Sequence, residues 1–120
     1  MADEVTVTGL LAFEKSPSAK ISVGLSAGKF SVTGTKYVHG VQNVGTAAEA
    51  IGLGDLGTPG WFYLKNLDTA NYVEILSATG GAVLLKIKAG EIAVGRFGAA
   101  APAAQANTAA VNIEYLIVED

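Results

Sequence analysis

The chain contains no cysteine, one histidine, three prolines and few charged residues, which make up 16% of its 120 positions. Without cysteine, it can form neither a disulfide nor a thiolate metal site. A catalytic metal site typically needs several histidine and carboxylate ligands, and His39 is the single imidazole. We therefore interpret His39 as a surface or packed strand residue, and we expect no metal and no cofactor.

Positive charge is also scarce, with 8 Lys and Arg against 11 Asp and Glu. Only Lys86 and Lys88 lie close together, whereas nucleic-acid binding needs clustered basic residues. No run approaches the roughly 20 apolar residues that span a membrane. The acidic N-terminus lacks the basic-then-apolar order of a signal peptide. We expect a protein that binds neither nucleic acid nor membrane and is not exported by the Sec route.

The dominant positive signal is an alternation of apolar and polar residues with period two, which is typical of β-strands. It is clear over residues 5–13, 21–27 and 111–117. At residues 27–29 the apolar set changes from odd to even positions, which predicts a turn or a β-bulge. Half of the chain is hydrophobic and 15 residues are glycine, so many short ordered segments separated by turns are expected.

These patterns predict an all-β fold, an antiparallel β-sandwich of about eight short strands with a jelly-roll-like arrangement. The length suits one sandwich domain over residues 1–120, with residues 1–4 as a flexible arm. Residues 46–51 are the one segment that could be helical. Residues 98–110, rich in alanine, are predicted to form a long loop of small residues. A barrel or an immunoglobulin-like sandwich remains an alternative, although the usual Cys…Trp…Cys pattern is missing.

No pattern in the sequence predicts catalysis. The Gly-x-Ser-x-Gly spacing occurs at residues 24–28, but within a predicted strand and not at the strand-to-helix turn that the elbow requires. The acids lie beside or within strands, where a solvated face explains them. Residues 52–57 match G-x-G-x-x-G, but a strand follows them where the dinucleotide motif requires a helix. We expect no enzyme, with no catalytic or cofactor-binding residues.

The aromatic residues are the best candidates for a binding surface. Trp61 and Tyr63 share one face of a strand and Phe62 and Leu64 the other, so one pair is expected in the core and the other at an interface. Aromatic and arginine side chains dominate the energetics of protein interfaces. The predicted interface residues are Trp61, Tyr63, Tyr72 and Arg96. The small residues of the loop at 98–110 would also suit contact with a neighbouring subunit.

Three stretches of the second half of the chain resemble small virion proteins of tailed bacteriophages. They are residues 60–75 (GWFYLKNLD followed by NYVEI), residues 85–91 (LKIKAGE) and residues 106–117 (ANTAAV followed by EYLI). The resemblance begins at about Gly60, and its motifs are strand and turn features. It implies a structural role, with capsid decoration (cement) proteins the favoured class. Such proteins are commonly small β domains that trimerise over gaps between capsid subunits.

The sequence analysis thus favours a capsid decoration protein that binds the major capsid protein and stabilises the head shell. From the resemblance we expect a homotrimer on the capsid surface of the virion, made in the host cytoplasm. The alternatives are a structural component of the tail or baseplate, and a carbohydrate-binding module that uses its aromatic residues as a platform. The host and the surface that contacts the partner are not determined by the sequence.

Overall fold

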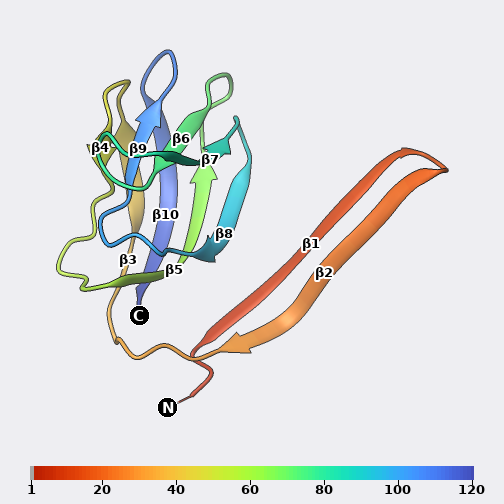
Figure 1. The fold of residues 1–120 in the computed structure, drawn as a ribbon, viewed down its shortest axis with the longest axis horizontal. Coiled ribbons are helices and arrows are strands. Elements are labelled where there is room, and N and C mark those ends of the chain that lie inside the picture. Colours follow the sequence, from red (N-terminus) through yellow and green to blue (C-terminus); the bar gives the residue numbers. More distant parts are fainter. Residues whose placement is uncertain (1) are drawn as a thin grey trace. The chain divides into compact units, whose positions relative to one another are not determined.

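The computed structural model describes residues 2–120, and all of their regular secondary structure is β-strand (Figure 1). The chain divides into two compact units, residues 1–32 and 33–120, where one domain was expected. Within residues 46–51, considered as a helix, the structure has the short strand β4 (Glu49–Ala50). The all-β class predicted from the alternation is confirmed.

The first unit is a long β-hairpin of β1 (Val5–Ser16) and β2 (Ala19–Phe30). Its register shifts between Val7 and Gly9, where the partner strand carries the extra residue near Ala27. Ala27 has a positive φ of 52°, as expected at a bulge that redirects the chain. The parity change predicted at residues 27–29 is therefore a β-bulge.

Residues 2–4, expected to form a flexible arm, contact the chain that follows β2. The amide of Asp3 donates to Ser31 Oγ at 3.1 Å, and Glu4 Oε2 accepts from the amide of Val32 at 3.4 Å. Met1 lies outside the described residues.

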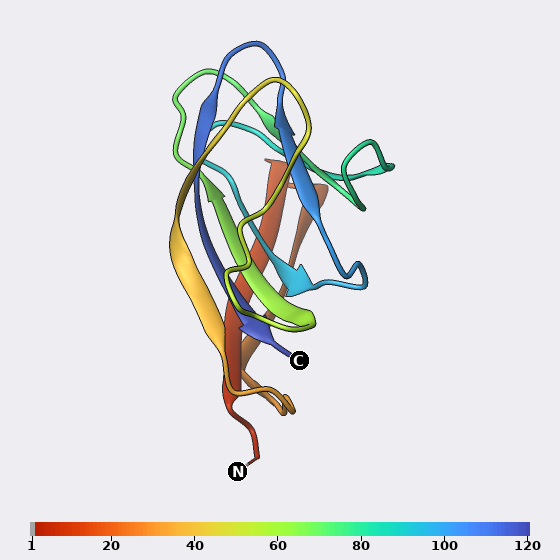
Figure 2. The ribbon, with the colours of Figure 1, turned by 90° about the vertical axis from the view of Figure 1, so that its left-hand side faces the viewer.

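The second unit is a sandwich of two four-stranded antiparallel sheets (Figure 2). The first sheet has the order β3-β10-β5-β8 and the second β4-β9-β6-β7. With the strands of this unit counted from β3, this is the order of a jelly roll, so the predicted arrangement is confirmed. The remaining strands of the sandwich are β3 (Tyr37–Val44), β5 (Pro59–Asn66), β6 (Val73–Leu76), β7 (Val83–Ile87), β8 (Ile92–Arg96), β9 (Ala103–Ala106) and β10 (Val111–Glu119).

The hydrophobic core lies between these two sheets. Phe62 and Leu64 of β5 point into it. Of the two pairs of side chains compared on this strand, they are therefore the pair in the core. The long strands β5 and β10 contribute alternate residues because one face of each is covered by the other sheet. The other core residues are Val44, Ile51, Leu56, Val73, Ile75, Ile87, Ala104, Ala106, Val111, Ile113, Tyr115 and Ile117.

The prediction of a long loop over residues 98–110 is wrong, because this stretch contains β9. Ala103, Ala104 and Ala106 are 0–2% exposed, and β9 pairs with both β4 and β6. A strand of alanines has the same lack of polar side chains as an apolar loop, which explains the error. Its small residues pack inside the chain rather than offering a subunit contact.

Candidate functional site

The surface with the most unusual composition is the outer face of the β3-β10-β5-β8 sheet, here called the outer sheet face. Along each of these strands, the residues between the core positions point away from the core. On a solvated sheet such positions are normally polar. Here the aromatic and aliphatic ones are Tyr37, Val41, Trp61, Tyr63, Ile92, Val94, Leu116 and Val118.

Strand register places these side chains in rows across the sheet. Tyr63 on β5 lies opposite both Leu116 on β10 and Val94 on β8, which forms a continuous apolar row. Trp61 pairs with Arg96 in the next row towards the end of the sheet. Because directly opposed side chains are about 5 Å apart, the members of each row are in contact range of one another.

The strands at both edges of this sheet carry the most exposed members. Tyr37 of β3 is 71% exposed, whereas Val94 of β8 is 48% exposed. Trp61 and Tyr63 on the central strand are half-buried. The surface is therefore a broad platform of apolar groups rather than a cleft.

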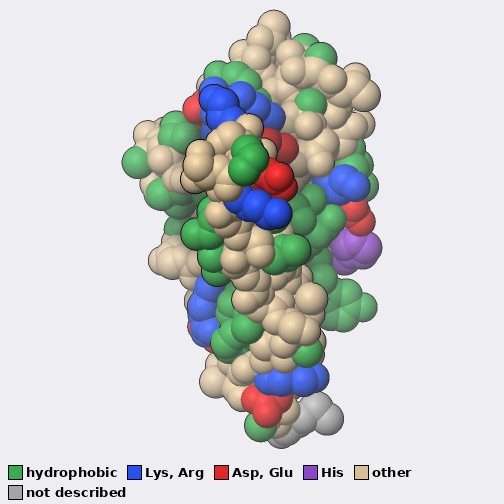
Figure 3. All heavy atoms as spheres, turned by 90° about the vertical axis from the view of Figure 1, so that its right-hand side faces the viewer, with side chains coloured by type: hydrophobic (Ala, Val, Ile, Leu, Met, Phe, Trp, Pro, Cys, Tyr) green, Lys and Arg blue, Asp and Glu red, His purple; other side chains and the backbone are tan. Residues whose placement is uncertain are grey.

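The outer sheet face also carries polar groups, among them Lys65 of β5, which has the same orientation as Trp61 and Tyr63. His39 Nε2 lies 3.2 Å from Glu114 Oε2, and Figure 3 shows the histidine (purple) beside an acidic side chain (red). Arg96 forms an ion pair with Asp120, which holds its guanidinium at the edge near Trp61. Pairing with Asp120 reduces the cost of desolvating Arg96 if this end of the face is covered.

The structure brings together three of the four predicted interface residues. Trp61, Tyr63 and Arg96 share the outer sheet face, in the register of β5 and β8. Tyr72 lies apart from them, immediately before β6 in the other sheet, where Lys86 Nζ sits 4.2 Å from the centre of its ring. Tyr72 therefore does not belong to the same surface.

Sequence reasoning missed the contributions of β3 and β10 to this surface. Tyr37 lies in a segment whose apolar spacing fitted a helix as well as a strand, so its face was ambiguous. Leu116 and Val118 could have been recognised from the sequence. They are apolar residues at even positions of β10, and the odd positions of that strand already form the core. Which strands adjoin is a property of the topology, and the sequence does not display it.

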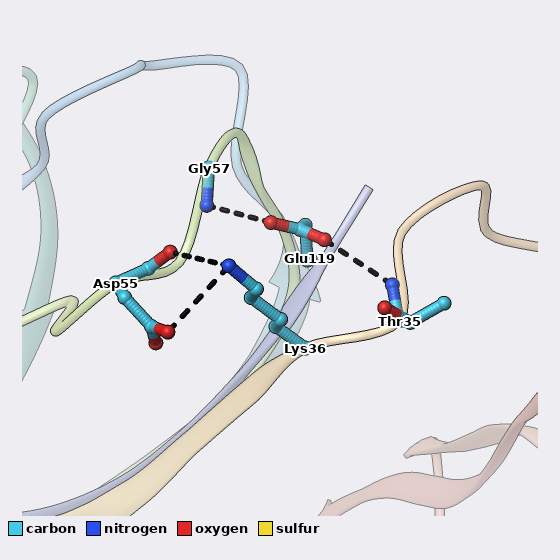
Figure 4. Close-up of polar contacts among 5 residues, drawn as sticks. All are labelled: Thr35, Lys36, Asp55, Gly57 and Glu119. Carbon is cyan, nitrogen blue, oxygen red and sulfur yellow. Dashed lines mark hydrogen bonds and ion pairs between the residues drawn. The ribbon is translucent and has the colours of Figure 1, made fainter.

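A second polar arrangement, around Glu119, ties three segments of the sandwich together (Figure 4). Its carboxylate accepts a hydrogen bond of 2.7 Å from the amide of Gly57 and one of 3.2 Å from the amide of Thr35. The hydrogen bond from Gly57, followed by that from Thr35, lowers the pKa of Glu119. Lys36 Nζ reaches Asp55 Oδ2 at 3.5 Å beside it. All of these acceptors are used internally, which identifies a structural clamp rather than a ligand site.

The motifs that carry the phage resemblance also have a structural explanation, centred on the fully buried Asn66. Its side-chain amide donates to the carbonyls of Asn71 and Ile87, each at 2.9 Å, and its Oδ1 accepts from the amide of Asp68 at 2.8 Å. Asp68 in turn accepts from the amide of Asn71 at 2.7 Å, which is the largest cause of its lowered pKa. These bonds fix the turns at one end of the sandwich.

The third stretch of the resemblance, residues 106–117, is joined to the same end of the sandwich by Asn107. Its Oδ1 accepts from the amide of Tyr72 at 2.8 Å, and its own amide donates to the Tyr72 carbonyl at 3.2 Å. The three stretches of sequence are therefore parts of one hydrogen-bonded network. The network explains these residues as determinants of the fold, and it assigns them no binding role.

A small apolar pocket of about 180 Å³ opens between the two sheets beside β7 and β8. Phe62 and Phe97 stack there with their ring centroids 4.3 Å apart, and Leu84, Leu85 and Arg96 line the rest. Among residues 2–120, no group of three or more His, Asp or Glu side chains is placed to hold a metal ion. That part of the chain also has no helix long and apolar enough to cross a membrane.

Comparison of the chain with protein-family models, with curated proteins and with solved structures found no match.

Proposed function

We propose that this chain is a structural protein of a tailed-bacteriophage particle, a capsid decoration protein that binds the head shell. The proposal includes no catalytic role. In it, the outer sheet face contacts the major capsid protein, and Trp61, Tyr63 and Arg96 lie at the centre of that contact. Tyr72 is left out, because it lies in the other sheet.

The observation that carries the proposal is the amount of apolar side chain left at the surface of a well-packed sandwich. Among residues 2–120, thirteen large hydrophobic residues are exposed, six in the hairpin and four on the outer sheet face, so ten of them belong to these two parts of the chain. Exposed apolar patches of this kind mark interaction sites. A role in assembly, in which both surfaces become covered, accounts for them.

The composition of the outer sheet face favours a protein over a small polar ligand. Apolar burial contributes roughly 25 cal/mol per Å², before the costs of association are subtracted. The central row of Leu116, Tyr63 and Val94 has no polar group apart from the Tyr63 hydroxyl, so contact with a complementary apolar surface is its best stabilisation. Around it, the hydrogen-bonded His39 and Glu114, the Lys65 side chain and the Arg96–Asp120 ion pair form a polar rim of the kind found around protein interfaces.

The direct test is to measure the chain on phage particles from lysates of cells in which its gene is expressed. A decoration protein is expected on heads in numbers comparable with the major capsid protein, whereas a tail or baseplate component is expected in few copies. Quantitative mass spectrometry of separated heads and tails gives the ratio. Absence of the chain from purified particles would refute the proposal.

Binding through the outer sheet face is tested with Tyr63→Glu, which places a charge in the centre of the apolar row. We expect roughly a hundredfold weaker binding to heads that lack the protein, because an unpaired charge would be desolvated. Val83→Glu is the matched control, since Val83 is 53% exposed on β7 of the other sheet. Equal binding by both variants would show that another surface makes the contact.

The rival carbohydrate-binding function is supported by the two half-buried aromatics of β5, Trp61 and Tyr63, on one face. Sugar stacking on this surface would change the fluorescence of Trp61, the single tryptophan of the chain. Titration with a panel of host-surface glycans separates the two functions. A saturable change that Tyr63→Glu abolishes would favour glycan binding.

A further inference from the structure

The N-terminal hairpin exposes a second apolar surface, which is separate from the outer sheet face. Cross-strand register pairs Leu11 with Val23 and Phe13 with Ile21, and it pairs Gly9 with Leu25 next to the bulge. Opposed residues of an antiparallel pair point to the same side. The exposed fractions are 80% for Leu11, 54% for Phe13, 62% for Ile21, 65% for Val23 and 47% for Leu25. These five residues are called the arm face.

The hairpin has no internal means of covering the arm face. None of residues 2–32 is buried, and β1 and β2 form a sheet of two strands only. An isolated two-stranded hairpin is at best marginally stable in water, and it needs a further layer against its hydrophobic side. On the opposite side, Leu10 is the one large apolar residue between positions 10 and 24, and Ala12 faces Ser22 while Glu14 faces Lys20.

The distribution of charge along the hairpin indicates what covers the arm face. Residues 5–13 and 21–28 contain no charged side chain, so a long neutral ribbon separates two charged ends. At the tip, Glu14 is accompanied by Lys15 and Lys20, and one acid against two bases gives a side-chain charge of +1. At the base, the two acids Asp3 and Glu4 with Lys29 give −1.

We propose that the arm face packs against the arm face of a second copy of this chain, with the two hairpins antiparallel. In this arrangement the positive tip of each hairpin lies beside the negative base of the other. A parallel arrangement would bring like-charged tips together. The contact is isologous, because the same residues are used on both copies, and it therefore joins chains in pairs.

The available area is at the lower limit for such a pair. An aromatic side chain such as Phe13 offers about 150–250 Å² and the aliphatic ones are near or below the lower end of that range, so the arm face presents at most roughly 500 Å² at its observed exposure. Two of them in contact would bury at most roughly 1,000 Å² in total, which is the lower bound for a specific interface. The proposal goes beyond the capsid-binding function, since it concerns the contact of the chain with itself. It also differs from the homotrimer implied by the phage resemblance.

The test is the mass of the purified full-length chain in solution, measured by sedimentation velocity and light scattering. A mass of two chains is expected, or of six if a threefold contact is also made. A mass of one or three chains would overturn the proposal. Because no capsid is present, this result is independent of whether the chain binds head shells.

Matched variants connect the mass to the arm face. The double variant Leu11→Glu with Val23→Glu is expected to weaken pairing by more than about a hundredfold, because it would bury unpaired charge. Ser22→Glu adds a charge to the opposite side of the same hairpin, and it is expected to leave pairing within about threefold. Pairing that survives in the double variant would refute the assignment of the contact to this face.

Cross-linking tests the orientation without disturbing the arm face, and it uses the lack of native cysteine. Ser18→Cys marks the tip of the hairpin and Ala2→Cys marks its base. When the two single-cysteine proteins are mixed and treated with a short bismaleimide, tip-to-base products are expected in excess. Tip-to-tip products in excess would overturn the antiparallel arrangement.

Discussion

Strands with alternating apolar residues form both the hairpin and the sandwich, yet the burial of those apolar residues differs between the two units. In the sandwich, residues such as Leu64 and Ile113 are 0% exposed between two sheets. In the hairpin, Leu11 is 80% exposed, although it belongs to an equally regular alternation. Alternation specifies which residues share a face, whereas burial depends on whether a second layer covers that face.

The difference indicates where the chain gains its stability and which apolar residues remain uncovered. Every residue of the hydrophobic core cluster belongs to residues 33–120. The apolar residues of the hairpin contribute little until another surface covers them, because the hydrophobic contribution follows the area removed from water. The hydrophobic core is therefore confined to the sandwich, and the proposed pairing would supply the layer that the hairpin lacks.

The sharpest test of this comparison is one substitution made in both units. Leu64→Ala should lower the free energy of unfolding by about 3–5 kcal/mol, because it leaves a cavity in a closed core. Leu11→Ala should change it by less than about 0.5 kcal/mol in the isolated chain. Urea denaturation followed by Trp61 fluorescence measures both, since Trp61 is in the sandwich. Similar losses for the two variants would contradict the division of roles.

A polar residue of the core gives the next largest effect. Asn66→Leu should destabilise the sandwich by about 2–4 kcal/mol, because the buried carbonyl of Ile87 would lose its donor and the turn after β5 its acceptor. Asn43→Leu removes a bond of 2.9 Å to Asn112 at an exposed position and is the control. A loss of about 0.5 kcal/mol or less is expected for the control. Equal losses would show that the network at Asn66 is not a special support of the fold.

The alanines of β9 allow a test in the opposite direction, by adding volume. Ala104→Leu should destabilise the sandwich by about 1–3 kcal/mol, because Ala104 is fully buried and its neighbours are close-packed. Ala12→Leu makes the same change at an exposed position of the hairpin, where about 0.5 kcal/mol or less is expected. Chemical denaturation of the two variants measures both changes in the free energy of unfolding. A tolerated leucine at position 104 would mean that β9 is loosely packed.

Acid provides a smaller effect that is confined to the sandwich. Glu119 and Asp68 have lowered pKa values in the folded chain, caused mainly by amide hydrogen bonds from Gly57 and Asn71, respectively. Their contribution is present above the unfolded pKa values of about 4.3 and 3.9, and it is lost as the pH falls through the lower folded values. Glu119→Gln should therefore show a flatter decline in melting temperature below about pH 4.5 than the native chain.

Thr8→Gln, in the hairpin, is a control for that measurement, because it introduces the same side chain away from the sandwich. Its acid dependence should match that of the native chain. If Glu119→Gln gave the same slope as the native chain, the clamp at Glu119 would not be a source of the pH dependence.

The smallest expected effect comes from the largest change, the removal of residues 1–32. The melting temperature of the sandwich should shift by less than about 3 °C, because the core is complete within residues 33–120. Differential scanning calorimetry at low concentration measures this shift, and sedimentation should show the loss of pairing. A large drop in melting temperature would mean that the hairpin supports the sandwich of its own chain.

The success and failure of the sequence predictions follow the same division. The bulge near Ala27 and the shared face of Trp61 and Tyr63 could be predicted, because each depends on the parity of neighbouring residues. The strand β9 was mistaken for part of a loop, because alanine has little β propensity and signals no alternation. The boundary at Val32 was missed because the alternation is as regular in the hairpin as in the sandwich.

The sequence by itself determined the all-β class, the face assignment of the strands and the turns, since period-two patterning and turn chemistry are local. Tertiary structure alone decided that β5 and β8 adjoin, so that Arg96 joins Trp61, and that Tyr72 lies in the other sheet. It also decided that Leu11 stays exposed while Leu64 is buried. The physical reason is that pairing and burial depend on contacts between residues far apart in the chain, and those contacts are specified by how the sheets stack.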